Sequence, residues 1–388
     1  MDEFFANSLA WASVLCYAAA AFGCVYALVA IWAVRGFVRP AAAHAPSYPP
    51  VTILKPLHGT QPNLYADLAG FCAQDYPAAV QIVFGVDDPD DPAIAVVHRL
   101  AANFPDRDLS LVVNALRHGE NRKVSNLINM VGAARHQILV VSDSDISVAP
   151  DYLADVVAGL QQPGVGLVTC PYYGKPVAGI WARLAAGAVN YHFLPNVLVG
   201  LKFGLARPCF GSTMALRKST LAAIGGFEAV VDQLADDYVL GALVRRAGLA
   251  VSILNRAVAH DCVESSARQL LRHEVRWART IRCVEPLGYL GLGITHPLPL
   301  ALLGLAFGGL GPAALIAVAA VACRLALQSE IDHAFDLHDD SFWLEPLRDI
   351  LSFVIFVMSY CGRDVEWGGH RYGLRADNSL AYYGEVET

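Results

Sequence analysis

The feature that most limits how this chain can fold is an uncharged run near its N-terminus. From Ser8 to Val34 there is no charged residue, and a helix of that length crosses the roughly 30 Å of hydrocarbon in a bilayer. A cleaved signal peptide is the alternative reading. It is disfavoured because the preceding stretch holds Asp2 and Glu3 with no basic residue, and because the run is too long. The run therefore indicates a permanent membrane helix.

The residues that follow the run set its expected orientation. Arg35 and Arg39 come directly after it, and positive charge beside a span marks the cytoplasmic side. We predict an anchor at residues 1–40, with the N-terminus outside and the residues after Arg39 in the cytoplasm. A segment rich in Pro and Ala, ending at Pro49-Pro50, leads into the next domain.

Further apolar stretches lie near the C-terminus. The stretch from Pro286 to Ala322 has no formally charged residue, and is either one span with a re-entrant piece or two short spans that turn near Gly309. A third stretch, Ile350 to Cys361, is short enough to lie in the interface. We predict membrane helices within 285–362 and a cytoplasmic tail at 363–388, with the number of spans open.

Composition agrees with a membrane protein and excludes one class of partner. Of 388 residues, 55% are hydrophobic and 16% charged, whereas ordinary soluble domains carry roughly 25% charged residues. The net charge of −7 argues against nucleic acid, because phosphate binding requires clustered Lys and Arg. The nine cysteines show no metal-finger spacing, so neither a zinc site nor a disulfide framework is indicated.

The middle of the chain alternates short apolar runs with helical patterns, which predicts a mostly parallel sheet covered by helices. The expected strands are Val51–Leu57, Gln81–Val86, Leu109–Asn114, Gln137–Ser142 and Val165–Cys170. The expected helices are Asn63–Ala73, Pro92–Asn103, Arg122–Ala134 and Asp151–Gln161. We predict an α/β domain at 50–284. The apolar, aromatic segment from Ile180 to Leu205 is either an interfacial helix or a buried helix of this domain.

Acidic residues follow two of the expected strands, where ligands bind in such sheets. One strand ends in Asp87-Asp88, and another ends in Asp143-Ser144-Asp145. Residues two apart on an extended chain share a face, and two carboxylates so close favour a cation between them. Oxygen ligands suit Mg²⁺ or Mn²⁺. The alternative is a solvated acidic turn after a buried strand.

Two later elements carry charge at helical spacing. Asp236 and Asp237 open a helical pattern, where acidic residues also simply complement the helix dipole. A basic helix follows, with its arginines on one side and Trp277 beside Arg276. Such a row could bind a diphosphate or lie along anionic lipid headgroups. Both interpretations remain open from the residues alone.

In this order, the motifs resemble the inverting glycosyltransferases of the GT-A fold, the group that holds ceramide glucosyltransferases and the cellulose and hyaluronan synthases. Its signature is an aspartate, a D-x-D, an acidic pair that holds the base, and (Q/R)-x-x-R-W before membrane helices. The corresponding elements here are Asp87, Asp143/Asp145, Asp236-Asp237 and His273-Glu274-Val275-Arg276-Trp277. His273 departs from the usual Gln or Arg, which leaves the role of that side chain open.

Shorter runs resemble one branch of that group. Ile53-Leu54-Lys55-Pro56-Leu57 is similar to the ceramide glucosyltransferases. Lys55-Pro56-Leu57-His58-Gly59 and the run Asn121-Arg122-Lys123-Val124-Ser125-Asn126-Leu127 are similar to the bacterial hopanoid-biosynthesis glycosyltransferase. That branch is understood to move N-acetylglucosamine from a UDP donor to bacteriohopanetetrol, a lipid acceptor in the bilayer. The resemblance implies a bacterial inner-membrane enzyme with a GT-A catalytic domain, Rossmann-like, flanked by transmembrane or interfacial helices.

The resemblance also implies roles for individual residues. Asp143 and Asp145 are expected to hold Mg²⁺ or Mn²⁺ on the diphosphate of a UDP-sugar. The expected donor-binding residues are Asp87, Asp88, Lys55, Lys123 and Asp143. Asp237, beside Asp236, is expected to accept the proton of the lipid hydroxyl. Arg276 is expected to stabilise the departing UDP, and Trp277 to border the acceptor.

Other functions fit the same motifs. A ceramide glucosyltransferase using UDP-glucose is the nearest alternative. A processive polysaccharide synthase usually carries several membrane helices after the Arg-Trp motif, and only about 100 residues remain here. A membrane-tethered UDP-sugar-binding protein would not need the base at Asp237. The sequence leaves open the sugar, the lipid, the choice between Mg²⁺ and Mn²⁺, and the oligomeric state.

Overall fold

The computed structural model describes residues 2–37, 47–308, 313–337, 341–375 and 379–385. Its internal contacts divide it into two compact units, which we describe one at a time. The helical unit comprises Met1–Arg39, Ala178–Arg207 and Glu264–Val365, and the sheet unit comprises Pro40–Val177, Pro208–Val263 and Glu366–Thr388. The Pro- and Ala-rich segment before Ser47, including Arg39, and the turn at Gly309 lie outside the described residues. The sequential domain boundaries given above stay a prediction.

The sheet unit is built on a seven-stranded sheet of order β3-β2-β1-β4-β8-β6-β9. The strands are β1 (Val51–Pro56), β2 (Val80–Val86), β3 (Asp108–Val113), β4 (Ile138–Val141), β6 (Val165–Thr169), β8 (Met214–Arg217) and β9 (Ala250–Ile253). Neighbours pair in parallel, except that β8 runs antiparallel to both β4 and β6. The predicted mostly parallel α/β sheet is confirmed, and the antiparallel β8 is an addition that sequence periodicity did not reveal.

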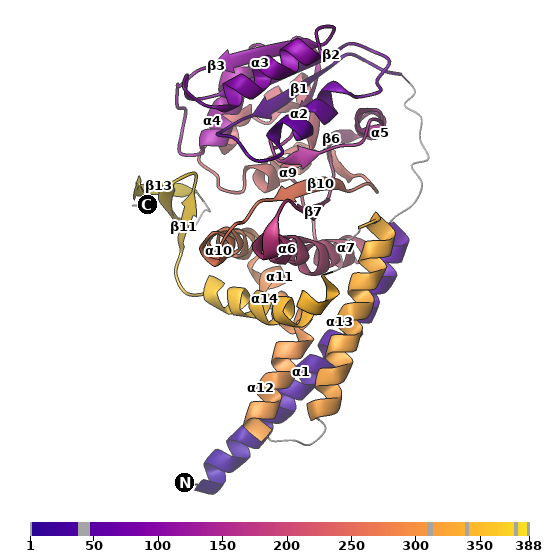
Figure 1. The fold of residues 1–388 in the computed structure, drawn as a ribbon, viewed down its shortest axis with the longest axis vertical. Helices are drawn as coiled ribbons and strands as arrows, with labels where there is room; N and C mark the ends of the chain where they lie inside the picture. Colours follow the sequence, from indigo (N-terminus) through magenta and orange to yellow (C-terminus); the bar gives the residue numbers. More distant parts are fainter. Residues whose placement is uncertain (1, 38–46, 309–312, 338–340, 376–378, 386–388) are drawn as a thin grey trace. The chain divides into compact units, whose positions relative to one another are not determined.

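Helices cover both faces of this sheet (Figure 1). They are α2 (Leu64–Cys72), α3 (Ala93–Asn103), α4 (Arg122–Val131), α5 (Tyr152–Leu160), α8 (Lys218–Ala223) and α9 (Asp236–Arg246), with a 3₁₀ turn at Phe227–Val230. Alternate residues of a strand point to opposite faces. Accordingly, Ile53 packs in one core cluster with α2, α3 and α5, whereas Leu54 packs in another with α4 and α9. Because both faces are covered, the central strands are apolar throughout.

Two smaller sheets complete the unit. One has the order β5-β10-β7, formed by β5 (Ile146–Ser147), β10 (Val258–Cys262) and β7 (Tyr172–Pro176). The other contains the antiparallel pair β12 (His370–Leu374) and β13 (Leu380–Glu385); the preceding strand β11 (Asp364–Trp367) crosses the boundary between the two units. Strand β5 of the first sheet begins directly after the D-x-D, so its pairing holds the end of the D-x-D loop in place.

The helical unit contains the long apolar helices. Its elements are α1 (Asp2–Phe37), α6 (Gly179–Ala188), a π-helix at Val189–Phe193, α7 (Leu194–Lys202), α10 (Ala267–Val284), α11 (Pro286–Gly291), a 3₁₀ turn at Leu292–Thr295, α12 (Pro297–Gly308), α13 (Ala313–Phe335), a 3₁₀ turn at Phe342–Leu344 and α14 (Glu345–Ser359). Helices α1, α12 and α13 pack side by side (Figure 1).

Three described helical segments are long and apolar enough to cross a membrane: Asn7–Phe37, Gly179–Lys202 and Ala314–Phe335. A fourth candidate is the pair Pro286–Thr295 and Pro297–Gly308, which is bent by 66° and counts only if both parts form one span. The first segment contains the uncharged run of the sequence. Gly179–Lys202 is mostly buried, which agrees with a packed helix. Helix α14 falls short of the length of a span, as its sequence suggested.

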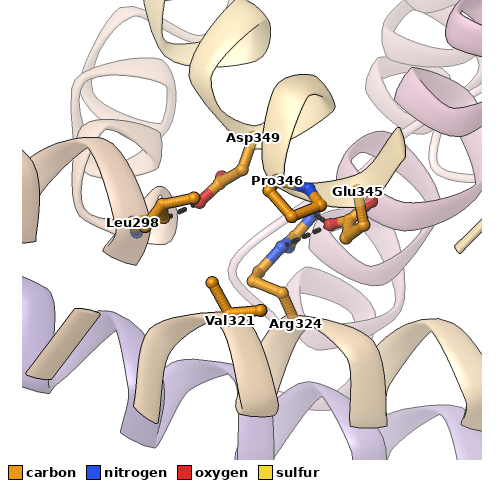
Figure 2. A pocket seen from close by; sticks show the side chains of 6 residues that line it. All are labelled: Leu298, Val321, Arg324, Glu345, Pro346 and Asp349. Atoms are coloured by element: carbon orange, nitrogen blue, oxygen red, sulfur yellow. Dashed lines mark hydrogen bonds and ion pairs between the residues drawn. The ribbon is translucent and has the colours of Figure 1, made fainter. Parts of the chain in front are cut away.

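Buried ion pairs join the helices of this unit. The guanidinium of Arg324 on α13 donates to Glu345 Oε1 at 2.8 Å, at the start of α14 (Figure 2). Asp349, one turn later, accepts the backbone N–H of Leu298 at 3.1 Å. Arg348 makes a two-pronged contact with the Glu274 carboxylate of α10, at 2.8 Å for each N–O pair. Paired charges of this kind avoid the cost of an isolated buried ion, so they fix α14 against α10 and α13.

Replacing Gly85 of β2 with Ala should destabilise the sheet unit. A Cβ there would lie 2.3 Å from Met130 Sδ and 2.4 Å from Asn126 Oδ1, both on α4. Overpacking of a buried site costs about 1–3 kcal/mol, so the melting temperature of the purified protein should fall by several degrees. Gly132 is the matched control, because a Cβ there meets nothing within 4 Å and its backbone is helical. An unchanged melting temperature for G85A would contradict the packing described here.

Candidate functional site

The D-x-D forms the loop between β4 and β5 and is held to both sheets. The N–H of Asp143 donates to Gly211 O at 3.3 Å, and the N–H of Asp261 donates to Asp145 O at 2.9 Å. The loop therefore lies at the carboxyl end of β4, where open α/β sheets bind their ligands.

Lys123, near the start of α4, links two of the predicted acidic motifs. Its ammonium lies 2.6 Å from Asp143 Oδ1 and 3.4 Å from Asp236 Oδ2. Burial alone would lower the pKa of Lys123, but Asp143 and Asp236 outweigh it and hold the pKa well above its usual range. The lysine thus stays charged and neutralises part of a dense group of carboxylates.

Asn121 fixes the helix that carries Lys123. Its side-chain oxygen accepts the N–H of Val124 at 3.0 Å, which caps α4. Its amide nitrogen donates to Gln233 O at 2.7 Å. One side chain therefore ties the start of α4 to the loop that leads into the acidic pair on α9.

Asp237 occupies the first turn of α9, beside Asp236. Its Oδ2 accepts the N–H of Gly211 at 2.7 Å, so it shares that residue with Asp143. Burial, followed by the neighbouring charge of Asp236, raises the pKa of Asp237 to about 7. A carboxylate with a pKa near neutrality is suited to accept a proton from a substrate.

Asp145 lies beside His260, because β10 pairs with β5 so that His260 is opposite Ile146. The distance from His260 Nδ1 to Asp145 Oδ1 is 3.5 Å. Burial acts to raise the pKa of Asp145, but His260 and then Lys55 outweigh it and bring the pKa to about 2. Among the described residues, His260 is the side chain beside this buried Oδ1, and at 3.5 Å its Nδ1 is a long contact. An ionised carboxylate with such an oxygen fits a divalent cation.

Lys55 lies beneath the D-x-D. Its fully buried ammonium donates to Asp143 O at 2.5 Å and to Ser142 Oγ at 3.3 Å, and it lies over the ring of Phe71. Burial lowers the pKa of Lys55 to about 7, although Asp145 and Asp143 oppose the shift. In this arrangement the lysine supports the backbone of the D-x-D loop.

The aspartates after β2 have different surroundings. Asp87 Oδ2 accepts from Arg122 Nη2 at 2.8 Å and from Arg122 Nε at 3.1 Å. Asp88 is exposed, and its Oδ1 accepts the N–H of Asp90 at 2.9 Å within the following turn. Asp87 is therefore oriented by a neighbouring cation, whereas Asp88 shapes the loop.

Arg276 and Trp277 lie on α10, in the helical unit. The neighbouring His273 contacts Glu264 Oε1 through Nδ1 at 2.5 Å, and its ring packs edge-on against Trp277 at 4.4 Å. Trp277 also approaches Phe193, with the ring centroids 6.4 Å apart. The departure at His273 thus has a local partner, Glu264, that the sequence did not indicate.

Within the sheet unit, the structure brings together the D-x-D, Lys55, Lys123, Asp236 and Asp237. Sequence reasoning did not foresee the hydrogen bonds of Asn121, Arg122 and Gly211, or the contact of His260 with Asp145. An Asn before a helical pattern is a capping signal, so Asn121 could have been found. His260 and Gly211 join the site through long-range strand pairing and loop packing, which leave no local signal.

A second possible metal set lies in the helical unit. Among the described residues, three ligand atoms from His192, His296 and Asp349 lie within 4.8 Å of one another. Arg324 donates to His192 Nε2 at 2.6 Å, and a neutral ring that accepts at one nitrogen carries its proton on the other. Asp349 is likewise engaged by Leu298. Protein hydrogen bonds thus occupy His192 Nε2 and both oxygens of Asp349, so the two carboxylates of the D-x-D fit a divalent cation better.

The fold and site define a class. The sheet, parallel except for β8 and covered by helices on both faces, is the fold of the GT-A glycosyltransferases. A mannosyltransferase from Pyrobaculum calidifontis, solved in complex with GDP-Man and Mn²⁺, has the same fold, with a TM-score of 0.52 and 22% identity over 91% of this chain and 99% of that one. The chain belongs to glycosyl transferase family 21, whose family model matches residues 15–380. The resemblance drawn from the ordered motifs is confirmed.

Curated relatives include two kinds of transferase. Ceramide glucosyltransferase 1 of Caenorhabditis elegans is 26% identical over 250 residues, which are 62% of this chain and 53% of the relative. An N-acetylglucosaminyltransferase of Bradyrhizobium diazoefficiens is 26% identical over 243 residues, which are 60% of this chain and 49% of the relative. The chain spans about half the length of these relatives.

Replacing Gly211 with Ala should damage the site while sparing the fold. A Cβ at this position would lie 2.7 Å from Asp143 Oδ2 and 3.0 Å from Lys123 Nζ. Both atoms end movable side chains, so they should shift without unfolding the protein. We expect binding of UDP with Mn²⁺, measured by calorimetry, to weaken by roughly tenfold, since displacements near 1 Å have effects of this size or larger. G132A serves as the control, and wild-type binding by G211A would contradict this account of the site.

Proposed function

We propose that the chain is a metal-dependent inverting glycosyltransferase that moves a sugar from a UDP-sugar to a hydroxyl group of a membrane lipid. The observation that carries the proposal is that two residues connect the D-x-D to the acidic pair. Gly211 hydrogen-bonds to both Asp143 and Asp237. Lys123 forms ion pairs with both Asp143 and Asp236. This linkage supports a base beside a cation-binding carboxylate in one rigid site. Family membership supports the same class of reaction.

Asp143 and Asp145 are the proposed ligands of Mg²⁺ or Mn²⁺, and His260 is a third candidate because it lies beside Asp145. The ion, when bound, supplies a Lewis acid for the diphosphate leaving group. Asp87 is the proposed contact to the uridine. Lys55 holds the D-x-D backbone in place for this task.

Asp237 is the proposed general base, since its raised pKa favours proton transfer near neutral pH. It would accept the proton of the lipid hydroxyl, whose oxygen attacks the anomeric carbon from the face opposite the leaving group and inverts it. Asp236 helps to raise the pKa of Asp237. Lys123 and Arg276 are proposed to add positive charge as UDP departs, the electrostatic effect that is usually largest.

The acceptor is proposed to reach the site from the bilayer, with Trp277 bordering it. The apolar helices support membrane attachment. In keeping with the positive charge after the first span, the 1–40 segment would anchor the chain, the 50–284 domain would face the cytoplasm, and 285–362 would associate with the membrane. A bacterial inner membrane is the proposed location.

The favoured reaction is transfer of N-acetylglucosamine to bacteriohopanetetrol. Two observations support it: the short sequence runs that resemble the hopanoid-biosynthesis glycosyltransferase, and the similarity to an N-acetylglucosaminyltransferase. The second candidate is a ceramide glucosyltransferase that uses UDP-glucose, favoured by the similarity to Ceramide glucosyltransferase 1. Discrimination between these sugars depends on contacts to one substituent.

The deciding experiment combines the two donors with the two acceptors. Washed membranes carrying the protein receive Mg²⁺ or Mn²⁺, UDP-glucose or UDP-N-acetylglucosamine, and bacteriohopanetetrol or ceramide, and products are identified by lipid mass spectrometry. An N-acetylhexosamine on the hopanoid supports the favoured reaction. Hexosyl-ceramide supports the second candidate and keeps the mechanism. The absence of glycolipid from every combination would contradict both.

Asp237→Asn should abolish turnover while keeping UDP binding. The amide cannot act as a base, and loss of general base catalysis costs roughly 10²–10⁴-fold in rate. Glycolipid formation by the same membranes measures the loss, and calorimetry with UDP checks binding. The exposed Asp106 provides a matched control, since D106N should behave as wild type. Unchanged turnover in D237N would remove this residue from the role of base.

The rate should depend on pH through Asp237. Its pKa is raised to about 7 by burial and by Asp236, and only the ionised carboxylate can accept the proton. We therefore expect kcat/KM for the acceptor to fall about tenfold per pH unit below pH 7 and to level off above it. Initial rates between pH 5.5 and 8.5 at saturating metal test this. A flat profile across that range would contradict the assignment.

A further inference from the structure

The C-terminal strands dock onto the sheet unit beside the acidic pair. The N–H of Leu380 donates to Asp232 O at 2.8 Å, and Ser379 forms an isolated antiparallel bridge with Gln233. Leu380 and Tyr372 are almost completely buried. The segment is thus a packed part of the unit, although its sequence suggested no chemical role.

The same strands reach the aspartate that follows β2. His370, the first residue of β12, lies 2.9 Å from Arg122 Nη1 through its Nε2. The other two nitrogens of that guanidinium donate to Asp87 Oδ2, at 2.8 and 3.1 Å. A continuous chain of hydrogen bonds therefore runs from the C-terminal strands to Asp87.

The protonation state of His370 determines which group donates in this chain of hydrogen bonds, and aromatic packing fixes its ring. Burial, then Arg122 and Arg117, lower the pKa of His370, so the ring is neutral near pH 7 and its Nε2 accepts from Arg122. The rings of Tyr372 and Tyr382 pack edge-on against His370, at 6.3 and 5.7 Å between centroids. These contacts hold the His370 ring in place. With the ring fixed, the Arg122 guanidinium has one orientation in which all three of its nitrogens form hydrogen bonds.

We propose that strands β12 and β13 complete the donor site, with His370 as a positioning residue that holds Asp87 through Arg122. The inference rests on the proposed function, in which Asp87 contacts the uridine of the donor. A guanidinium is a planar, rigid fork, so fixing one nitrogen fixes the plane of the other two. Without His370, Arg122 could rotate, and Asp87 would lose the orientation that suits the nucleotide.

A positioning role for His370 predicts an effect on the affinity for the sugar donor but not on the rate of the chemical step. The base and the proposed metal ligands are held by Gly211, Lys123 and Lys55, and none of these contacts includes His370. Loss of the positioning contact should therefore raise KM for the UDP-sugar and the Kd of UDP, and should leave kcat and KM for the lipid near their wild-type values.

The test measures UDP binding by calorimetry with full-length protein in detergent and Mn²⁺. Hydrogen bonds to charged groups contribute about 1.5–3 kcal/mol, and part of that should be lost when Asp87 is misplaced, so H370A should bind UDP about 5–10-fold more weakly. In H370Q the amide oxygen can still accept from Arg122, and its affinity should stay within about twofold of wild type. His98, exposed on α3, provides the control H98A, which should bind normally.

Three outcomes would count against this inference. Wild-type affinity in H370A would contradict it directly. An equal loss in H370A and H370Q, together with equally lowered melting temperatures, would show that the strands only support the fold. If wild-type protein does not bind UDP at all, the proposed function itself is wrong, and the inference falls with it.

Discussion

The site depends on one interaction, the contact of the Lys123 ammonium with Asp143 and Asp236. Four carboxylates gather here, since Asp145 and Asp237 lie within the same set of loops, and like charges at short range cost free energy when water is excluded. Lys123 offsets part of this cost and joins two motifs almost 100 residues apart in the sequence. Removing its charge would leave buried carboxylates unpaired, which is far costlier than losing a surface ion pair.

The fold creates this gathering by inserting one antiparallel strand into a parallel sheet. Because β8 runs opposite to β4, with Met214 paired to Val141, the residues that enter β8 lie at the end where β4 finishes. Gly211 therefore meets Asp143, and its N–H remains free to bind Asp237 at the start of α9. A Cβ here would displace the Asp143 carboxylate, so the glycine keeps the two aspartates in place. A purely parallel sheet would carry that segment to the opposite edge.

The sequence could predict the features that depend on local pattern. Strand and helix alternation gave the parallel sheet, and the carboxylates after β2 and β4 followed from the rule for strand ends. The features it missed depend on long-range pairing. Strand β8 has only four residues, too few for a clear period, and His260 reaches Asp145 through the pairing of β10 with β5. The surroundings of Lys55 were likewise invisible, because an apolar strand interior gives no sign that a lysine is satisfied beneath a loop.

The charge balance of the site connects its parts. Asp143, Asp145, Asp236 and Asp237 face two ammonium groups, those of Lys123 and Lys55, so four ionised carboxylates would exceed two charged lysines. Burial, followed by the charge of Asp236, raises the pKa of Asp237 to about 7. Carboxylates whose charge is only partly balanced stabilise added positive charge, which agrees with the cation proposed for the D-x-D.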